Sequence, residues 1–177
     1  MSTEMNVRVF SLLIMARWPL IALAASAFML SAAHVFETVW KLPPCALCLH
    51  QREAYWAAGS IALIAAIAER FRDDVLSQRA FALLLTCAFG AGAVIGGFHF
   101  GVEYKWWPGL AACAGGGNYD TSADLLGALS KSMDVPACDK VAWSLLGVSM
   151  AGWNTLISLG LMGVSFTRAL TPSPVTD

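Results

Sequence analysis

Charged residues are scarce in this 177-residue sequence, where Asp, Glu, Lys and Arg make up 13% of the chain against 58% for hydrophobic residues. The formal net charge is -1 at pH 7, and the chain has no long run of basic residues. Binding to a phosphate backbone needs clustered positive charge, so the sequence excludes a nucleic-acid-binding protein. A mean hydropathy of +0.63 is instead typical of a membrane protein.

Internal repeats are also absent, and the sequence predicts one helical domain over residues 1–170 followed by a polar tail, 171–177, that we expect to be disordered. Crossing a hydrocarbon core of about 30 Å takes roughly 20 helical residues. Four apolar segments reach this length, at about residues 18–36, 47–68, 80–102 and 143–166. The sequence therefore predicts an all-α, integral membrane four-helix bundle.

The second segment reaches spanning length only if its helix begins near Cys45. Pro43 and Pro44 fit such a start, because proline fixes φ near the helical value and lacks an N–H that would be unpaired there. Cys45 and Cys48 would then lie in the first turns of the helix, at one edge of the membrane.

The orientation is predicted from Lys and Arg residues near the ends of short loops. We interpret the first segment as an uncleaved helix, because it is longer than a usual signal-peptide core and three more segments follow it. Four spans place both termini on one side of the membrane, together with the loop 69–79. That side holds six basic residues and the opposite side holds five, and the six are spread over fewer residues. We therefore expect both termini to be cytoplasmic.

Four of the five cysteines fall on the opposite side of the membrane. Cys45 and Cys48 follow the first span, whereas Cys113 and Cys138 lie in the loop of roughly 40 residues after the third, and long loops are often functional. Cys87 lies inside the third span, where we expect it to pack as a small hydrophobic residue. Four thiols that face an oxidising compartment favour disulfides.

Two features of the long loop stand out. Residues 121–133 predict a short amphipathic helix on the membrane surface, because their large apolar side chains fall on one face. Cys113 is followed by the run Gly115–Gly117, and glycine leaves the backbone free to adopt many conformations. A cysteine in this position could reach several partners.

The spacing of Cys45 and Cys48 lets two thiols close a small disulfide, and the thiolate is the reactive species. Arg52 lies one helical turn after Cys48, where its charge should favour a Cys48 thiolate. Arginine at the edge of the hydrocarbon is costly and usually paired or functional, with snorkelling to the interface as the alternative. His99, near the outer end of the third span, is a second candidate for a functional ionisable residue at this depth. The alternative is a histidine that lies at the interface without a role.

A metal site competes with this interpretation, since cysteine and histidine are zinc ligands and His50 follows the CxxC. Zinc sites usually add a second closely spaced pair, but Cys113 and Cys138 are far apart and neither has a neighbouring histidine. A c-type haem needs histidine directly after the second cysteine, where Leu49 stands. We therefore predict no metal.

The arrangement as a whole resembles the DsbB family: four spans, a CxxC that opens the second, an arginine four residues on, and a second cysteine pair in the long loop. The resemblance covers nearly the whole chain. Its most specific parts are PPCALCLHQR (43–52), HFGVEYKWWPGLAAC (99–113) and PACDKVAW (136–143). Members of this family reoxidise the dithiol oxidase DsbA and pass two electrons to a membrane quinone, which keeps the bacterial periplasm oxidising.

This resemblance implies an enzyme of the bacterial inner membrane, in contact with lipid and with its cysteine loops in the periplasm. A reduced DsbA-type partner would attack the Cys113–Cys138 disulfide, with Cys113 forming the mixed disulfide. Cys138 would then pass the reduction on to Cys45 and Cys48.

The resemblance also implies a quinone site, for ubiquinone or menaquinone. Cys48 would meet the quinone ring, while Arg52 and His99 would stabilise negative charge on the quinone oxygens. The resemblance gives no role to His50 or to Glu103, which lies four residues after His99.

Two other functions stay open at this point. One is a thiol oxidoreductase similar to vitamin K epoxide reductase, although its quinone-side CxxC lies late in the chain, whereas here it opens the second span. The other is a non-enzymatic membrane scaffold whose disulfides only staple loops and resist mild reductant. The sequence also leaves open the oligomeric state, a general or dedicated DsbA partner, and the resting connectivity, either Cys45–Cys48 with Cys113–Cys138 or a Cys45–Cys138 bridge.

Overall fold

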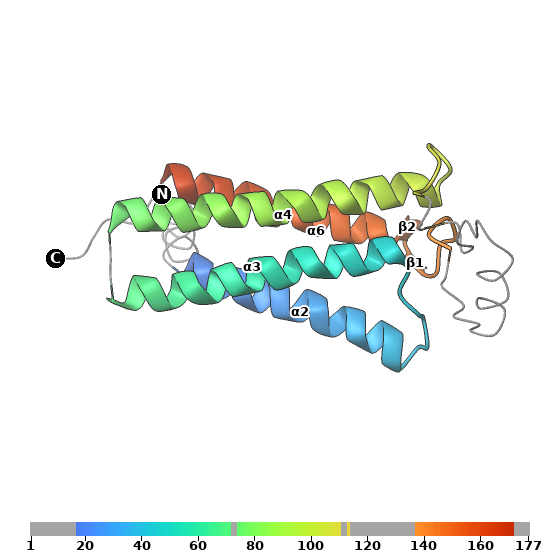
Figure 1. The fold of residues 1–177 in the computed structure, drawn as a ribbon, viewed down its shortest axis with the longest axis horizontal. Coiled ribbons are helices and arrows are strands. Elements are labelled where there is room, and N and C mark those ends of the chain that lie inside the picture. The colour runs from blue at the N-terminus through green and yellow to red at the C-terminus, as the bar shows by residue number, and fades with distance from the viewer. Residues whose placement is uncertain (1–16, 72–73, 111–112, 114–136, 172–177) are drawn as a thin grey trace, which may run out of the picture.

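The computed structural model describes residues 17–71, 74–110, 113 and 137–171. This part of the chain forms four long helices and one short hairpin (Figure 1). The helices are α2 (Trp18–Thr38), α3 (Ala46–Phe71), α4 (Val75–Glu103) and α6 (Met150–Leu170), and the strands are β1 (Ser144–Leu145) and β2 (Val148–Ser149). The predicted all-α class is confirmed, whereas the predicted surface helix, 121–133, and the tail beyond Thr171 lie outside the described residues.

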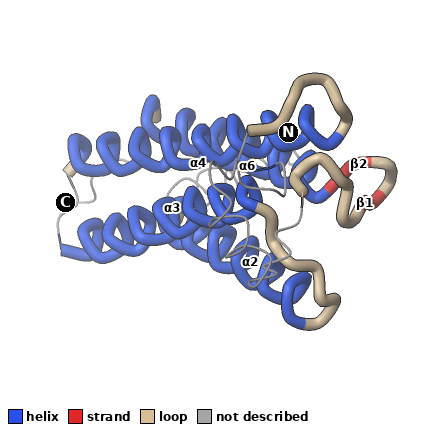
Figure 2. Tube along the Cα trace, turned by 45° about the vertical axis from the view of Figure 1, so that its right-hand side comes forward, coloured by secondary structure: helices blue, strands red, loops and turns tan. Residues whose placement is uncertain are grey.

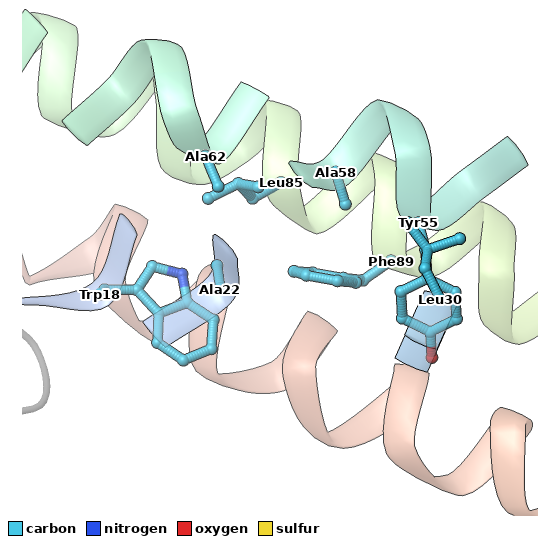
Figure 3. Close-up of a cluster of buried hydrophobic side chains, with 8 residues drawn as sticks. All are labelled: Trp18, Ala22, Leu30, Tyr55, Ala58, Ala62, Leu85 and Phe89. Atoms are coloured by element: carbon cyan, nitrogen blue, oxygen red, sulfur yellow. The ribbon is translucent and has the colours of Figure 1, made fainter. Parts of the chain in front are cut away.

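The four helices lie side by side as one elongated bundle, in which α4 packs against α3 and α6, and α2 against α3 (Figures 1 and 2). Small alanines between the helices let them approach closely, and larger rings fill the remaining space (Figure 3). Two buried hydrogen bonds tie α6 to its neighbours, from Trp18 Nε1 to Ser165 Oγ at 3.2 Å and between the hydroxyls of Tyr55 and Ser158 at 2.8 Å. The cluster comprises Trp18, Ala22, Leu30, Tyr55, Ala58, Ala62, Leu85 and Phe89.

The outer surface of the bundle is apolar. Large side chains such as Phe28, Trp56 and Val94 are exposed on three different helices, as expected for surfaces that face lipid. Within the described residues, α2 and α4 are long and apolar enough to cross a membrane. Spanning by α3 and α6, which carry more polar side chains such as Arg52 and Asn154, stays a prediction.

Helix α3 begins at Ala46, which confirms the predicted start near Cys45, and Pro43 and Pro44 lie just before it. Cys45 occupies the capping position: its carbonyl accepts the first helical bond from Leu49 N at 3.1 Å. Its Sγ accepts the N–H of Cys48 at 3.3 Å, as a capping side chain does. The CxxC is therefore part of the start of the helix.

The fourth helix begins at Met150, not near residue 143 as predicted. The apolar residues that extended the hydropathy signal form the β1–β2 hairpin, where Leu146 and Gly147 have φ of 54° and 78°. Two successive residues with positive φ are typical of the tight turns that join antiparallel strands. Ser149 then caps α6 by accepting the N–H of Gly152 at 3.2 Å.

Candidate active site at the cysteine end of the bundle

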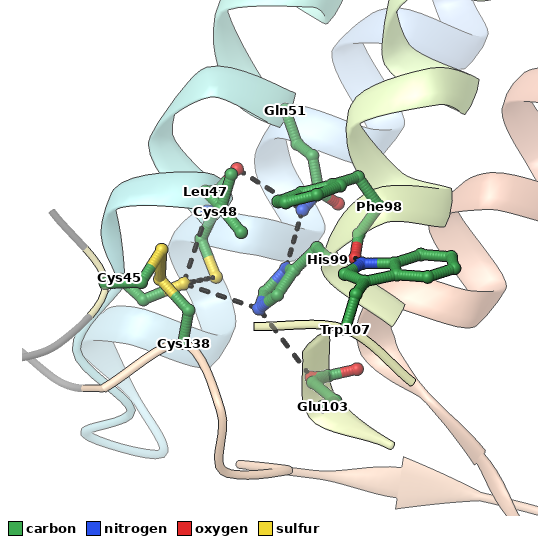
Figure 4. The surroundings of a disulfide bond; sticks show 10 residues. Cys45, Leu47, Cys48, Gln51, Phe98, His99, Glu103, Trp107 and Cys138 are labelled. Carbon is green, nitrogen blue, oxygen red and sulfur yellow. Dashed lines mark hydrogen bonds and ion pairs between the residues drawn. A yellow bond between two sulfur atoms is a disulfide. The ribbon is translucent and has the colours of Figure 1, made fainter. Parts of the chain in front are cut away.

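The four cysteines expected outside the membrane gather at one end of the bundle, where α3 begins and α4 ends (Figure 4). Cys113 and Cys138 form a disulfide, with their Cα atoms 5.0 Å apart. Cys45 and Cys48 are unbonded, with their sulfurs 2.8 Å apart. Cys45, Cys113 and Cys138 are buried in one cluster with Leu47 and Val102, so the structure brings both cysteine pairs together.

The segment after α4 turns back over the helix and leads the chain toward this cluster. Lys105 adopts a φ of 62°, and the N–H of Trp106 bonds to the carbonyl of Gly101 at 2.8 Å. The Trp107 ring then lies directly on Gly101, where a Cβ would come within 2.0 Å of the ring. Only glycine permits this approach, and Trp107 Nε1 secures it by donating to the carbonyl of Phe98 at 3.0 Å.

Three hydrogen-bonding groups surround the Cys45 sulfur. It contacts the Cys48 thiol, the Cys48 N–H, and Nε2 of His99 at 3.6 Å. The hydrogen bond with the Cys48 thiol, followed by those with His99 and the Cys48 N–H, lowers the pKa of Cys45, which lies just before α3. The geometry therefore stabilises a thiolate at Cys45, not at Cys48 as the sequence led us to expect.

Arg52 does not direct its charge at Cys48. Its guanidinium donates to Glu37 Oε2 at 2.5 Å and to the carbonyl of Ala33 at 3.3 Å, both on α2. Its side chain is mostly buried in this contact. Arg52 thus joins α2 to α3 beside the CxxC. This pairing offsets the free-energy cost of placing a charged side chain at the edge of the hydrocarbon.

His99 is buried and lies at the centre of a chain of polar side chains. Its Nδ1 is 2.8 Å from Gln51 Nε2, and Gln51 Oε1 accepts a hydrogen bond from Asn154 Nδ2 at 2.6 Å. Its Nε2 lies 3.9 Å from Oε1 of the buried Glu103. Glu103 Oε2 accepts a hydrogen bond from Ser149, so this residue links the end of α4 to the start of α6.

Asn154 on α6 donates a hydrogen bond to Gln51 on α3, a residue that sequence reasoning missed. The available signal was a polar residue three positions after Cys48, because that spacing puts it on the same helical face as the CxxC. His50 points away from the site and pairs with the exposed Glu53 at 2.9 Å.

A different set of residues brings possible metal ligands close together. The ligand atoms of Cys45, Cys48 and His99 all lie within 4.8 Å of one another. His99 thus replaces His50 as the histidine to be weighed in any metal interpretation of this CxxC.

Comparison with known proteins decides the family. The family model described as disulfide bond formation protein DsbB matches residues 15–167, which include both cysteine pairs, the helices α2, α3 and α4, and most of α6. The chain belongs to the DsbB family. It is therefore a membrane protein of disulfide bond formation, with the chemistry of a disulfide-forming oxidoreductase.

Individual DsbB relatives agree with this assignment. The chain is 34% identical to disulfide bond formation protein B of Methylococcus capsulatus over 80% of its own length and 86% of the relative. It is 31% identical to the protein of the same name from Marinobacter nauticus, over 76% and 83% of the two chains. The corresponding protein of Saccharophagus degradans is 30% identical over 85% and 90%. No solved structure matches this DsbB chain.

Proposed function

We propose that this DsbB-family protein reoxidises a periplasmic DsbA-type dithiol oxidase and passes the two electrons through its cysteine pairs to a membrane quinone, ubiquinone or menaquinone. The observation that carries the proposal is the buried cluster in which the Cys113–Cys138 disulfide packs against Cys45. Thiol–disulfide exchange needs the attacking thiolate to reach a disulfide sulfur. This arrangement is suited to exchange between the pairs, which a scaffold of independent staples would not need.

The relay can be written with its bonds and electrons balanced, starting from two oxidised cysteine pairs. A thiolate of the partner attacks Cys113, forms a mixed disulfide and releases Cys138 as a thiolate. Cys138 attacks Cys45 of the oxidised CxxC, which forms a Cys45–Cys138 bridge and releases Cys48 as a thiolate. Because Cys45 is the cysteine of the CxxC that lies in the buried cluster with Cys138, we assign the attack to this sulfur.

The partner's second thiol then attacks the mixed disulfide, which frees the oxidised partner and leaves Cys113 reduced. Cys113 attacks the Cys45–Cys138 bridge, restores the Cys113–Cys138 disulfide and leaves Cys45 and Cys48 as a dithiol. The structure has this arrangement of bonds, one disulfide and one dithiol. In the proposed relay, a state with these bonds holds the two electrons taken from the partner.

The residues at the CxxC fit a quinone. Cys48 is only half-buried, next to the exposed Leu49 on the outside of α3. Arginine has five N–H donors, and the bonds of Arg52 to Glu37 and Ala33 occupy two of them. Arg52 and His99 would donate to the carbonyl oxygens, and a bound quinone would take two electrons and two protons as Cys45 and Cys48 reform their disulfide.

We also propose that the cysteine end of the bundle faces the periplasm of a bacterial inner membrane. The first and last described residues both lie at the opposite end of the bundle (Figure 1), as expected for cytoplasmic termini. Arg70 and Arg168, in the last turns of α3 and α6, mark that end with positive charge.

The test is an assay of electron flow in purified, detergent-solubilised protein. A reduced DsbA-type dithiol and ubiquinone, or menaquinone in a parallel reaction, are mixed with the protein, and quinone absorbance is followed. We expect consumption that is lost in Cys48→Ser and in Cys113→Ser. Cys87→Ser is the matched control, because Cys87 faces outward on α4 and lies about 18 Å from His99 along the helix.

No consumption of either quinone, with disulfides that stay intact in mild reductant, would refute the proposal in favour of a stapled scaffold. Consumption that survives Cys113→Ser would also refute it, because electrons would then bypass the loop disulfide.

A further inference from the structure

Gln51 lies between two other buried polar side chains, and both ends of its amide are engaged. Its Oε1 accepts from Asn154 Nδ2 at 2.6 Å, which connects α3 to α6. Its Nε2 lies 2.8 Å from Nδ1 of His99 on α4. All three side chains are buried, so these contacts are shielded from water.

The orientation of the Gln51 amide is fixed by a third contact. Gln51 Nε2 also lies 3.3 Å from the carbonyl oxygen of Leu47, one turn earlier on α3. A carbonyl oxygen only accepts hydrogen bonds, so the group that faces it must be the NH₂ and not the amide oxygen. The same NH₂ therefore donates to Nδ1 of His99.

A nitrogen that accepts a hydrogen bond carries no proton, and in neutral imidazole the proton must then be on the other nitrogen. The surroundings of Nε2 agree with this, because it faces two acceptors, the Cys45 sulfur at 3.6 Å and a Glu103 carboxylate oxygen at 3.9 Å. An imidazolium would set an N–H of Nδ1 against the Gln51 NH₂, donor against donor. We infer that Gln51, held by Asn154 and Leu47, is a positioning residue that fixes neutral His99 in its Nε2-protonated tautomer.

The fixed tautomer decides what His99 can do for the CxxC, and this part of the inference rests on the proposed thiol oxidation. An Nε2–H donates a hydrogen bond to the Cys45 thiolate and favours that charged form. It has no lone pair to offer a cation at the same position. Gln51 thus keeps Cys45, Cys48 and His99, whose ligand atoms are close enough to hold a metal, available for thiol chemistry.

The direct test is the ¹⁵N spectrum of ring-labelled histidine in the full-length protein in detergent, with Cys45 and Cys48 reduced and neither quinone nor partner present. Couplings to the ring protons identify each nitrogen, and His99 is assigned by its loss in His99→Asn. We expect Nδ1 to give the signal of an unprotonated nitrogen and Nε2 that of a protonated one. The opposite pattern, or an imidazolium at pH 8, would overturn the inference.

Gln51→Glu reverses the hydrogen bond at nearly constant shape, since a carboxylate can only accept. We expect Nδ1 of His99 to become protonated in this variant. Gln78→Glu is the matched control: Gln78 is also buried, bonds to Arg168, and lies about 30 Å from His99 along α4. An unchanged His99 spectrum in folded Gln51→Glu would overturn the inference. If Gln51→Glu does not fold, Gln51→Met takes its place, and we expect that variant to show both His99 tautomers.

A second measurement uses Co²⁺ as a probe in a Cys113→Ser/Cys138→Ser background, where those two thiols cannot bind the ion. A carboxylate behind a histidine orients it for a metal and typically changes metal affinity 10–100-fold. We expect Gln51→Glu to bind Co²⁺ at least about 10-fold more tightly, and equal affinities would contradict the inference. The spectra and Co²⁺ binding require no quinone, so the tautomer can be established even if the electron-flow assay fails.

Discussion

The contact between α4 and α6 makes a sharp prediction at two adjacent glycines. A Cβ on Gly96 would lie 2.8 Å from Thr155 Oγ1, 2.9 Å from Asn154 Nδ2 and 3.4 Å from the carbonyl oxygen of Ala151. A Cβ on Gly97 would meet only Thr155 Cγ2, at an ordinary 3.6 Å. Both residues lie in the same helix, so that Gly→Ala brings the same gain in helix propensity of about 0.5–1 kcal/mol at each position.

The neighbours of Gly96 have little freedom to move aside. Thr155 Oγ1 bonds to the Ala151 carbonyl at 2.8 Å, and Asn154 bonds to Gln51. Overpacking of a buried site typically costs about 1–3 kcal/mol. We therefore expect Gly96→Ala to be less stable than Gly97→Ala by about 1–3 kcal/mol.

The assay is unfolding of the two variants in mixed micelles of mild detergent and dodecyl sulfate, followed by circular dichroism at equal protein concentration. Gly97→Ala should be as stable as the unaltered protein or more stable. Equal stabilities for both variants would refute the close approach of α4 to α6 at Gly96, and with it the position of Asn154.

Three further predictions concern interactions between segments. In a double-mutant cycle with Arg52→Gln and Glu37→Gln, the half-buried ion pair should give a coupling energy of about 1 kcal/mol. This value lies between those for exposed ion pairs and for charged hydrogen bonds, and a coupling energy near zero would contradict the ion pair. Tyr55→Phe removes the buried bond to Ser158 and should cost about 1–2 kcal/mol of unfolding free energy, which a stability unchanged in the same micelle assay would disprove. The hydrogen bond and charge of Lys105 lower the pKa of the Asp139 carboxyl, so this pair should stabilise the fold above the unfolded pKa of about 3.9 and lose its contribution as pH falls through the folded pKa. Unfolding measured from pH 6 to pH 2 should show this loss in the unaltered protein but not in Asp139→Asn, and identical pH profiles would count against the pair.

The corrected position of the thiolate shows where helical spacing misleads. Arg52 follows Cys48 by one turn, so the sequence favoured an interaction between them. A guanidinium on a long side chain can also reach across to another helix, and here it finds the carboxylate of Glu37. Capping geometry and His99 then place the donors around Cys45 instead.

What the sequence by itself determined was local. Hydropathy predicted the helices because a spanning helix is a run of neighbouring residues that are mostly apolar. The CxxC with Arg52 identified the end of the bundle that holds the cysteines. The start of α6 was misplaced because the apolar Leu145 and Leu146 match a helical segment in hydropathy, although Gly147 permits a tight turn there.

Only the tertiary structure decided which polar groups meet. Gln51 and Asn154 are separated by 103 residues, and Cys45 and His99 by 54. Their contacts depend on how each helix is rotated about its axis and how closely α3, α4 and α6 approach, which no local pattern encodes. The chemistry of a histidine depends in turn on which nitrogen faces a donor, so its tautomer could only be inferred once the helices were placed together.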